Sequence, residues 1–354
     1  IRDPLWCRGL GDVYKILVYY YLFRDYEMIE WGLSFGSHDS AIAVFQDDAL
    51  VFATEGERWS RKKHDKELPQ NLIDYVIQTY GDPQEIYYFE DWEKKNHRRK
   101  VAGQEPKLKP RMIAGKHYND WNITGHHHSH ASWGYYSSPF VGEGTCTTIV
   151  IDAIGEWDTL TQWKVSDDYN FGHTNIECVK RWKYPKSIGL FYSAMTQRVG
   201  LKANAEEHKF EQLAKKGNWR KNYRMFMEEL VKSRFPFKTH FNFHRGCNWW
   251  RPELNSEQDM ADIAASTQHI FEQVLMCASS WIQMHIKTSN IVLVGGCALN
   301  RTARTKLESV WDDIWVPKNP GDPGSCVGAV LAKYNRHIDF QDKMWYNKEH
   351  GETE

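Results

Sequence analysis

Paired cysteines, net charge and long apolar runs are all scarce in this chain. Its 354 residues include seven cysteines, an odd number, scattered without a Cys-x-x-Cys pair. The sequence therefore predicts no disulfide framework and favours a reducing, cytoplasmic setting. The most apolar N-terminal run, from Ile16 to Phe23, spans only eight residues. That is too short to cross a membrane, so no membrane partner is expected.

The near absence of net charge excludes two further classes of protein. Lys and Arg number 45 against 46 for Asp and Glu, which leaves a formal net charge of −1. A uniformly basic nucleic-acid binder and an acidic disordered chain are both excluded. A content of 41% hydrophobic and 26% charged residues is typical of a globular protein. Any function that depends on charge must therefore come from local patches.

The apolar pattern repeats in two halves. Strands are predicted at 29–35, 41–45, 49–54 and 86–89, with a helix at 72–80. Further strands are predicted at 147–151, 159–165, 175–182 and 291–294, with a long helix at 257–287. Two halves of this kind imply a duplicated α/β fold with a cleft between two lobes.

The same pattern suggests boundaries within the chain. Residues 1–27 show no clear period, and alternation begins after Met28, so we interpret 1–27 as an N-terminal extension outside the core. The first lobe is then expected at 28–145, with a basic insertion at 91–123. The second lobe is expected at 146–354, with a basic and aromatic helical insertion at 215–251.

Turns rich in glycine follow strands at equivalent places in the two halves. One runs from Gly36 to Ser40, and another from Asp152 to Thr159. A glycine turn lets backbone N–H groups approach a phosphate because no Cβ blocks access. Each turn by itself is also typical of an ordinary hairpin. The pair Gly295-Gly296 follows a buried strand, an arrangement that favours close packing of a nucleotide.

A histidine cluster, His126-His-His-Ser-His130, is the strongest local signal. If a helix opens at Gly125, residues i and i+4 share one face, and His126 and His130 can bind one metal ion. Asp322 and Asp152 are the carboxylates predicted to complete the site. Two histidines with carboxylates suit Fe(II), Mn(II) or Zn(II). A His-rich surface helix that binds no metal is the alternative interpretation.

Taken together, the motifs resemble the O-carbamoyltransferases of nodulation-factor and antibiotic biosynthesis. The catalytic domain of that family is similar to the enzymes that transfer threonylcarbamoyl to tRNA, within the actin/hexokinase-like superfamily. The resemblance runs from Leu33 to about Leu331. It rests on Ser37-His-Asp-Ser, Glu57-Arg-x-x-Arg-Lys-Lys-His-Asp65, His126-His-x-Ser-His-Ala131, Asp152-x-x-Gly-Glu156, Ser187-Ile-Gly-Leu-x-Tyr-Ser193, Lys202-x-Asn204, Glu207-x-Lys209, Gly295-Gly-Cys-Ala-Leu-Asn300 and Gly321-Asp-x-Gly324.

This resemblance implies a duplicated actin/hexokinase-like, ribonuclease-H-like fold and a metal-dependent transfer of a carbamoyl group to a hydroxyl. Carbamoyl phosphate and ATP would supply the group through carbamoyl-adenylate. We expect His38 to be the general base, because imidazole titrates near neutral pH, and Lys209 and Arg58 to contact the donor. The residues expected to line the nucleotide are Gly36, Ser37, Gly155, Glu156, Gly295, Gly296 and Asn300.

The chain departs from the family in two respects, and the smaller is that it reads Ala214-Lys-Lys-Gly217 where the family tends to have an Ala-Pro-Tyr-Gly turn. Members of the family usually continue into a C-terminal domain that makes carbamoyl-adenylate, whereas this sequence ends soon after the first domain. Two expectations stay open. Either the chain makes its own adenylate, or a separate adenylate-forming protein is its partner.

Two basic segments have no place in the resemblance. Residues 94–117 carry nine Lys or Arg against one acid, and residues 215–238 carry eight against two, with aromatics interleaved. Cations and flat rings are what a nucleic-acid strand requires, although a solvated helix face with core aromatics has the same pattern. The predicted contacts are Arg98, Arg99, Lys100, Lys215, Lys216, Trp219, Arg220, Trp249 and Trp250.

These segments make a hydroxymethylated pyrimidine in DNA the expected acceptor. Alternatives are a sugar or antibiotic hydroxyl, threonylcarbamoyl transfer to tRNA, an ATPase or kinase, and a non-catalytic nucleic-acid-binding module.

Overall fold

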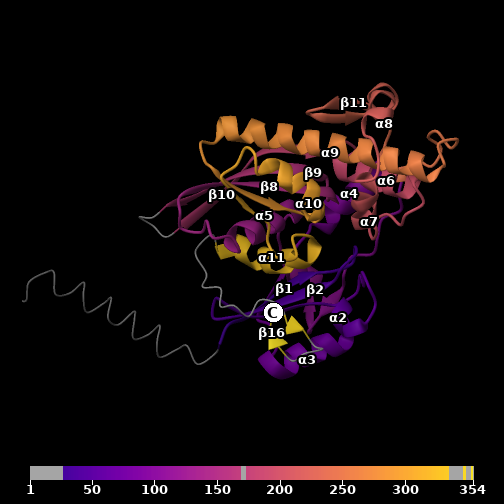
Figure 1. Cartoon of the computed structure of the whole chain (residues 1–354). Coiled ribbons are helices and arrows are strands. Elements are labelled where there is room, and N and C mark those ends of the chain that lie inside the picture. Colours follow the sequence, from indigo (N-terminus) through magenta and orange to yellow (C-terminus); the bar gives the residue numbers. More distant parts are fainter. Residues whose placement is uncertain (1–26, 169–172, 335–345, 348–351, 354) are drawn as a thin grey trace, which may run out of the picture.

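The computed structural model describes residues 27–168, 173–334, 346–347 and 352–353 (Figure 1). Nearly all of the predicted extension, 1–27, lies outside the described residues. None of the helices in these ranges combines the length and apolar character needed to span a bilayer.

Two five-stranded sheets form the framework, and their strands follow the same order. The first sheet is ordered β3-β2-β1-β4-β7 and the second β10-β9-β8-β13-β14. In each sheet the first three strands of the half pair antiparallel, and the last two add in parallel. The repeated order confirms the predicted duplicated ribonuclease-H-like fold, with one sheet in each half.

The strand bounds agree closely with the alternation in the sequence. Every residue of β1 is buried, as expected for a central strand packed on both faces. The strands of the first sheet are β1 (Ile29–Ser34), β2 (Ala41–Gln46), β3 (Ala49–Glu55), β4 (Glu85–Tyr88) and β7 (Asn122–Ile123). Those of the second are β8 (Thr145–Gly155), β9 (Asp158–Asp168), β10 (His173–Lys183), β13 (Asn290–Val294) and β14 (Asp313–Trp315). Three two-stranded pairs are β5 (Met112–Ile113) with β6 (Lys116–His117), β11 (Val231–Arg234) with β12 (Phe237–Thr239), and β15 (Tyr346–Asn347) with β16 (Glu352–Thr353).

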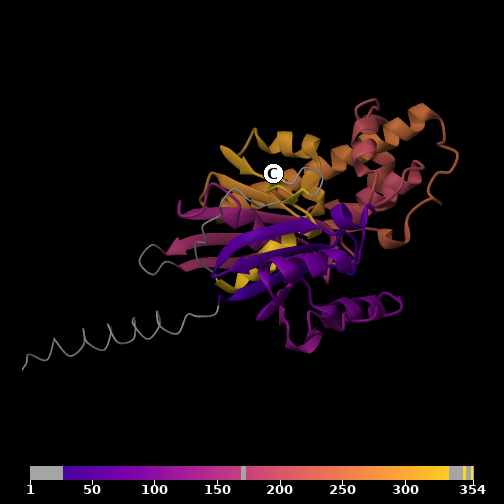
Figure 2. The same ribbon diagram turned by 90° about the horizontal axis from the view of Figure 1, so that it is seen from below.

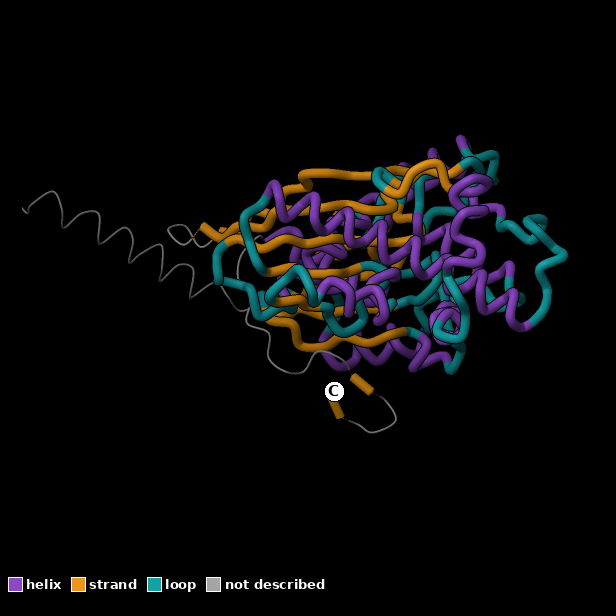
Figure 3. The backbone as a smooth tube through the Cα atoms, turned by 45° about the horizontal axis from the view of Figure 1, so that its top comes forward, coloured by secondary structure: helices purple, strands orange, loops and turns teal. Residues whose placement is uncertain are grey.

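Helices lie over the sheets and between them (Figure 3). The predicted long helix is α9, which runs along the second half and opens with a capping box at Ser256 (Figure 1). The α-helices are α2 (Glu57–Ser60), α3 (Gln70–Tyr80), α4 (Trp92–Val101), α5 (His126–Tyr136), α6 (Ile188–Arg198), α7 (Glu207–Ala214), α8 (Arg220–Met225), α9 (Glu257–His285), α10 (Arg301–Leu307) and α11 (Ser325–Tyr334). Short 3-10 helices are η1 (Tyr118–Asp120), η3 (Phe243–Arg245), η4 (Gly296–Leu299) and η5 (Asp322–Gly324), and a π-helix, η2, spans Phe226–Leu230.

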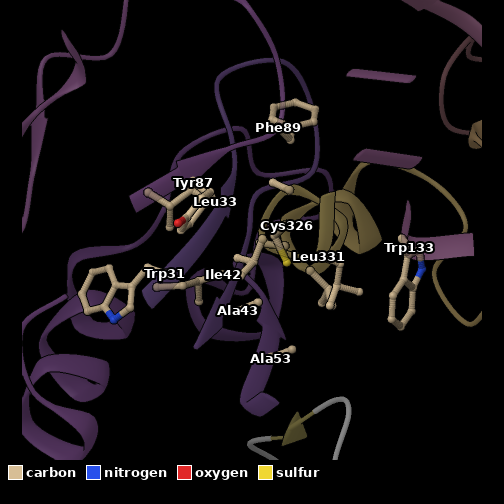
Figure 4. Packing of buried hydrophobic residues seen from close by; sticks show 14 of the residues in the cluster. Trp31, Leu33, Ile42, Ala43, Ala53, Tyr87, Phe89, Trp133, Cys326 and Leu331 are labelled. Atoms are coloured by element: carbon tan, nitrogen blue, oxygen red, sulfur yellow. The ribbon is translucent and has the colours of Figure 1, made fainter. Parts of the chain in front are cut away.

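Helices α5 and α11 pack between the two sheets at positions where only glycine fits. A Cβ at Gly32 of β1 would overlap the backbone of α11 at Cys326. A Cβ at Gly328 of α11 would overlap the Ser129 carbonyl of α5, and one at Gly134 of α5 would press on Val292 and Val294 of β13. The order is therefore first sheet, α11, α5, second sheet. Figure 4 shows Cys326 and Leu331 of α11 beside Leu33 and Ile42 of the first sheet.

The two halves thus exchange helices. A division of the chain at residue 145 separates the strands of the sheets, but α11 comes from the C-terminal half and covers the first sheet. This exchange holds the first turns of α5, the end of β8 and the start of α11 close together.

The segment 215–251 lies at one end of the molecule (Figures 1 and 2). Most of its aromatic rings belong to the second hydrophobic core, with Phe226, Phe237, Phe243 and Trp250 all buried. Core packing therefore explains most of the aromatic content that the sequence left open.

Candidate metal centre

Four side chains from three elements meet between the sheets. His126 and His130 stand one turn apart on α5, Asp152 lies near the end of β8, and Asp322 opens η5 immediately before α11. Gly155 passes directly against the ring of His126, where a Cβ would overlap the imidazole. A glycine at this point of β8 is therefore required for the histidine to reach its place.

The donor atoms of these residues converge. His126 Nε2 lies 3.1 Å from Asp152 Oδ2, 3.4 Å from Asp322 Oδ1 and 3.2 Å from His130 Nε2. His130 Nε2 lies 3.5 Å from Asp322 Oδ1 and 3.8 Å from Asp152 Oδ2. Donors about 2.1 Å from one ion stand roughly 3.0 to 3.4 Å apart, depending on the bond angle. Two imidazoles and two carboxylates at these separations fit one first-row divalent metal ion.

In each of the two candidate histidine ligands, the ring nitrogen that points away from the cluster faces a polar side chain. His130 Nδ1 lies 3.0 Å from Ser325 Oγ, and His126 Nδ1 lies 3.6 Å from Glu90 Oε2. Such outer contacts orient metal-binding imidazoles. The other two histidines of the cluster point elsewhere: His127 bonds to Thr161, and His128 stacks on Trp163. The helical spacing thus correctly separated the converging pair from its neighbours.

The charges in this cluster reinforce one another. Burial opposes the charged form of His126, but the carboxylates of Asp322 and Asp152 outweigh it and raise the pKa of His126 well above its ordinary value. Burial would likewise raise the pKa of Asp322, yet His126 and His38 hold it well below its ordinary value. Two carboxylates kept ionised in a buried place provide the negative charge that a cation requires.

A cavity of about 350 Å³ adjoins the cluster. The first half contributes His38, Asp39 and His64 to its wall, and Asp152 forms part of the same wall. The second half contributes the rest: Ala153, Gly189, Tyr192, Ser193, Asn204, Ala205, Glu207, His208, Glu211, Phe271, Gly296, Cys297, Leu299 and Asn300. The predicted cleft between the lobes is therefore present, and one candidate metal ligand borders it.

His38, the expected base, faces this cavity. Its Nε2 lies 3.8 Å from Asp322 Oδ2 and its Nδ1 2.9 Å from Asp39 Oδ2. The negative charge of Asp322 raises the pKa of His38 to about 9, with burial opposing and Asp39 adding to the rise. In this state the imidazole is protonated at neutral pH. A cation that balanced the charge of Asp322 would lower the pKa of His38, because Asp322 is the largest cause of its rise.

The residues predicted to hold the nucleotide divide into two groups. Gly296 and Asn300 line the cavity, and Gly295, with φ +96°, supports them against the backbone of Ile151. Asn300 caps α10 through Ala303 N and donates to Tyr192 and Gln268, so its amide is firmly held.

The second group lies behind the cluster instead. Glu156 accepts from the backbone N–H groups of Asp91 (2.7 Å) and His126 (3.2 Å). Gly155 packs on His126, Ser37 bonds to Glu90 and Lys95, and the carbonyl of Gly36 lies 3.4 Å from Lys107 Nζ. These residues do not line the cavity. In this structure Glu156 and Gly155 contact His126, and Ser37 contacts the Glu90–Lys95 pair behind it.

Two predicted donor-binding residues do not reach the cavity wall. The ammonium of Lys209 pairs with Glu206 at 2.5 Å, and its side chain is more than half exposed. Arg58 is on α2, and its Nε lies 3.9 Å from Glu55 Oε2. Neither residue is among those that line the cavity. The resemblance predicted that both would contact the donor, but their side chains face acidic residues three positions earlier in the sequence.

The structure overturns two of the predicted nucleic-acid contacts. Arg98 is 4% exposed beneath Tyr184, and Trp250 is 2% exposed with its indole bonded to Glu229. Neither can contact a nucleic acid here. Trp219 is stacked on His269 with 3.8 Å between ring centroids, so one face of its ring is covered. Arg99, Lys100, Lys215, Lys216, Arg220 and Trp249 remain partly or fully exposed.

Sequence reasoning missed several residues that the structure places at the site. Glu90 and Lys95 form a buried ion pair behind His126. The signal for Glu90 was its position directly after a buried strand of the parallel part of the sheet, where functional groups gather. Glu207 accepts from Ser193 Oγ (2.8 Å) and Asn204 N (2.7 Å), and all three line the cavity. All three residues belong to the motifs that carry the family resemblance, but the sequence assigned no role to them.

A comparison with protein families matches most of the chain to one model. Residues 30–114 and 101–331 match the model described as the carbamoyltransferase N-terminus. The match covers the three elements that supply the candidate metal ligands, as well as every residue of the cavity wall.

Comparison with individual proteins identifies distant relatives. An uncharacterized protein of Synechocystis is 27% identical over 360 positions, which cover 87% of this chain and 57% of that protein. The nodulation protein NolNO of Sinorhizobium fredii is 23% identical, with 84% of this chain and 46% of that protein covered. The chain thus spans about half the length of these curated relatives.

Solved structures resemble the chain only loosely. Component A of the (R)-2-hydroxyglutaryl-CoA dehydratase of Acidaminococcus fermentans aligns with 87% of this chain and 99% of its own, at 15% identity and a TM-score of 0.47. Similarity at this level adds nothing to what the strand order already shows.

Proposed function

Because the chain belongs to the carbamoyltransferase family through the module at the N-terminus of its members, we propose that it transfers a carbamoyl group to an acceptor hydroxyl. The proposed donor is carbamoyl-adenylate made from carbamoyl phosphate and ATP. One observation carries the proposal. Four side chains that could hold one metal ion converge beside a cavity, and one of them, Asp152, lines that cavity together with His38.

His126, His130, Asp152 and Asp322 would hold the divalent ion, which is Fe, Mn or Zn by the chemistry of its donors. When bound, the ion supplies a Lewis acid that neutralises the phosphate of the donor and polarises the carbamoyl carbonyl. Gly296, Asn300 and Glu207 would position the nucleotide along the second-half wall.

In the transfer itself, the acceptor oxygen bonds to the carbamoyl carbon while the bond from that carbon to the phosphate oxygen breaks. AMP leaves with the electron pair, and the acceptor proton passes to His38 Nε2, which faces Asp322 across 3.8 Å. A cation held by Asp322 would balance the largest of the charges that raise the pKa of His38. The Nε2 of the imidazole would then be free to accept a proton.

The direct test incubates the purified chain with carbamoyl phosphate, ATP, a divalent metal and a panel of hydroxyl compounds, with mass spectrometry of the products. A product heavier by one carbamoyl group in place of hydrogen is expected, together with AMP. His126→Ala and His38→Ala should both lose the product, but only His126→Ala should lose bound metal. Full transfer by metal-free enzyme in the presence of a chelator would contradict the assignment.

A second arm of the same test supplies carbamoyl-adenylate that has been made separately. If the chain needs a partner to form the adenylate, only this arm yields product. If the chain is self-sufficient, both arms do. Transfer in neither arm, to any acceptor, would overturn the proposed activity.

For the acceptor, we retain a hydroxymethylated pyrimidine in DNA. The support is a group of exposed cations that have no acidic partner among the described residues, namely Lys215, Lys216 and Arg220. A base must leave the helix, or come from a single strand, to reach the cavity. Neutralising the three should weaken binding to all DNA sequences alike and flatten its salt dependence. Arg224→Gln is the matched control, since Glu228 already neutralises Arg224. Unchanged DNA affinity at every salt concentration would leave a sugar or other small alcohol as the acceptor.

A further inference from the structure

A second group of histidine and carboxylate side chains lines the cavity beside the candidate metal centre. It joins the turn at residues 36–40 to the loop at residues 61–67. Two backbone hydrogen bonds fasten these segments together, from Gly36 N to the Lys66 carbonyl (2.6 Å) and from Ser40 N to the Asp65 carbonyl (2.7 Å). The Ser40 hydroxyl adds a third bond, to the Glu67 carbonyl at 2.8 Å. The loop is thereby held in register beside the turn.

The side chains between these segments form a continuous chain. Asp39 lies between two imidazoles, with Oδ2 2.9 Å from His38 Nδ1 and Oδ1 2.7 Å from His64 Nδ1. The backbone N–H of His64 donates to Glu57 Oε2 at 2.9 Å. His38, Asp39 and His64 all line the cavity. Both oxygens of Asp39 are therefore used, one by each ring.

Two residues of this chain have an uncommon backbone conformation. Asp39 and His64 both lie in the left-handed region, with φ of +52° and +54°. Residues other than glycine are uncommon there, and they persist only where the surrounding structure holds them. Both strained residues are members of the same hydrogen-bonded chain. In this conformation both side chains line the cavity.

We propose that Asp39 and His64 are positioning residues for His38. The proposal rests on the function proposed above, in which His38 Nε2 takes the acceptor proton. By accepting the Nδ1–H of His38, Asp39 selects the tautomer whose Nε2 lone pair faces Asp322 and the cavity. By donating to the other oxygen, His64 keeps the carboxylate from rotating away. Neither residue touches the reacting atoms in this arrangement.

A second metal ion is the competing explanation for this cluster. Donor atoms of Asp39, Glu57 and His64 lie within 4.8 Å of one another. However, the Nδ1 of His64 is already bonded to Asp39, and Glu57 already accepts from the His64 backbone. None of the three side chains is fully buried. The hydrogen bonds within the group account for its geometry without an ion.

Steady-state kinetics of four variants tests the proposal. Asn at position 39 has only one side-chain oxygen, so it can accept a hydrogen bond from only one of the two imidazole rings. In Asp39→Asn, kcat should therefore fall roughly 10²- to 10⁴-fold while KM for the acceptor changes little. His64→Leu removes the donor and should lower kcat by a smaller factor. His64→Asn keeps an N–H near the position of Nδ1 and should recover most of that loss. Lys63→Ala, in the same exposed loop, is the matched control.

Equal losses in His64→Leu and His64→Asn, or an unchanged kcat in Asp39→Asn, would overturn the proposal. Metal analysis belongs to the same series. One ion per chain is expected in every variant. Two ions in the wild type, with one lost in His64→Leu, would show that the cluster is a metal site instead.

Proton NMR detects these hydrogen bonds without any acceptor substrate for the carbamoyl group. Two downfield imidazole N–H resonances are expected, one from each ring bonded to Asp39. His64→Leu should remove one, and Asp39→Asn should shift or remove both. Their presence in a protein that transfers no carbamoyl group would contradict the proposed function but not the positioning. Their absence from an active enzyme would contradict the positioning alone.

Discussion

Glu90 and Lys95 show how much the candidate metal centre depends on charges that lie behind it. Their ion pair is buried, with side chains 2% and 7% exposed. Burial alone would raise the pKa of Glu90, but Lys95 and His126 hold it below its ordinary value. A carboxylate fixed beside the outer nitrogen of a metal-binding histidine orients the ring and strengthens it as a ligand.

Glu90→Gln should therefore weaken metal binding roughly 10- to 100-fold, because it removes the charge that faces His126 Nδ1. Competition with a calibrated chelator measures this change. Glu93→Gln, on the exposed face of α4, should bind metal as the wild type does. If both variants kept the wild-type affinity, Glu90 would only balance Lys95.

Two adjacent tryptophans have opposite surroundings. Trp250 is packed against Phe226 and bonds to Glu229, whereas Trp249 is 55% exposed. Trp250→Ala should lower the free energy of unfolding by about 3 to 5 kcal/mol through the cavity it leaves. Trp249→Ala should change it by less than about 0.5 kcal/mol. Urea denaturation of both variants measures the difference, and similar losses would contradict the burial assigned here.

At the scale of elements, the contact between α5 and α11 sets the geometry of the candidate metal centre. α5 carries both candidate histidine ligands, and α11 begins at Ser325, directly after the short helix η5 that Asp322 opens. Their backbones approach most closely where Gly328 meets the Ser129 carbonyl. A side chain there would push α11 away from α5, and with it the carboxylate of Asp322.

Gly328→Ala should accordingly cost about 1 to 3 kcal/mol of unfolding free energy and weaken metal binding as well. Thermal denaturation and metal titration measure the two effects. Gly321→Ala is the control for stability, since a Cβ there meets only ordinary contacts at 3.8 Å and the backbone φ is −82°. Loss of stability without any change in metal affinity would separate helix packing from the site.

For the whole molecule, the paired charges of the metal-free centre predict how stability depends on pH. The pKa of His126 is raised by the carboxylates, and that of His38 is raised to about 9. Their contribution is complete below the unfolded value of 6.5 and is lost as pH rises through the folded values. The lowered pKa values of Asp152 and Asp322 act oppositely. Their contribution is present above 3.8 and is lost as pH falls through the folded values.

Metal-free protein should therefore become less stable as pH rises from 6.5 to 9, whereas metal affinity should rise over the same range because binding displaces protons. Urea denaturation with chelator present, and calorimetric titration in buffers of different ionisation enthalpy, measure the two trends. Asp322→Asn should flatten the first. A metal-free protein equally stable across this range would show that these histidines are not held protonated.

The sequence by itself determined the repeated order of strands, the long helix and the pair of histidines that share one face of α5. These features follow from local rules, since apolar alternation and a spacing of four residues depend only on neighbours along the chain. Asp152 and Asp322 were also predicted to complete the cluster, Asp152 because it follows a predicted strand and Asp322 because it stands in the turn Asn-Pro-Gly-Asp-Pro-Gly.

Only the tertiary structure decided which charges and rings are buried, and which partners meet across the fold. Arg98 and Trp250 carry the same sequence signal as their exposed neighbours, yet they pack beneath Tyr184 and against Phe226. Asp39 bonds to His64, which is 25 residues away in the sequence. Gly328 meets Ser129 because α11, from the C-terminal half, packs against α5. Contacts of this kind leave no period in the sequence, because they arise from how separate elements pack together.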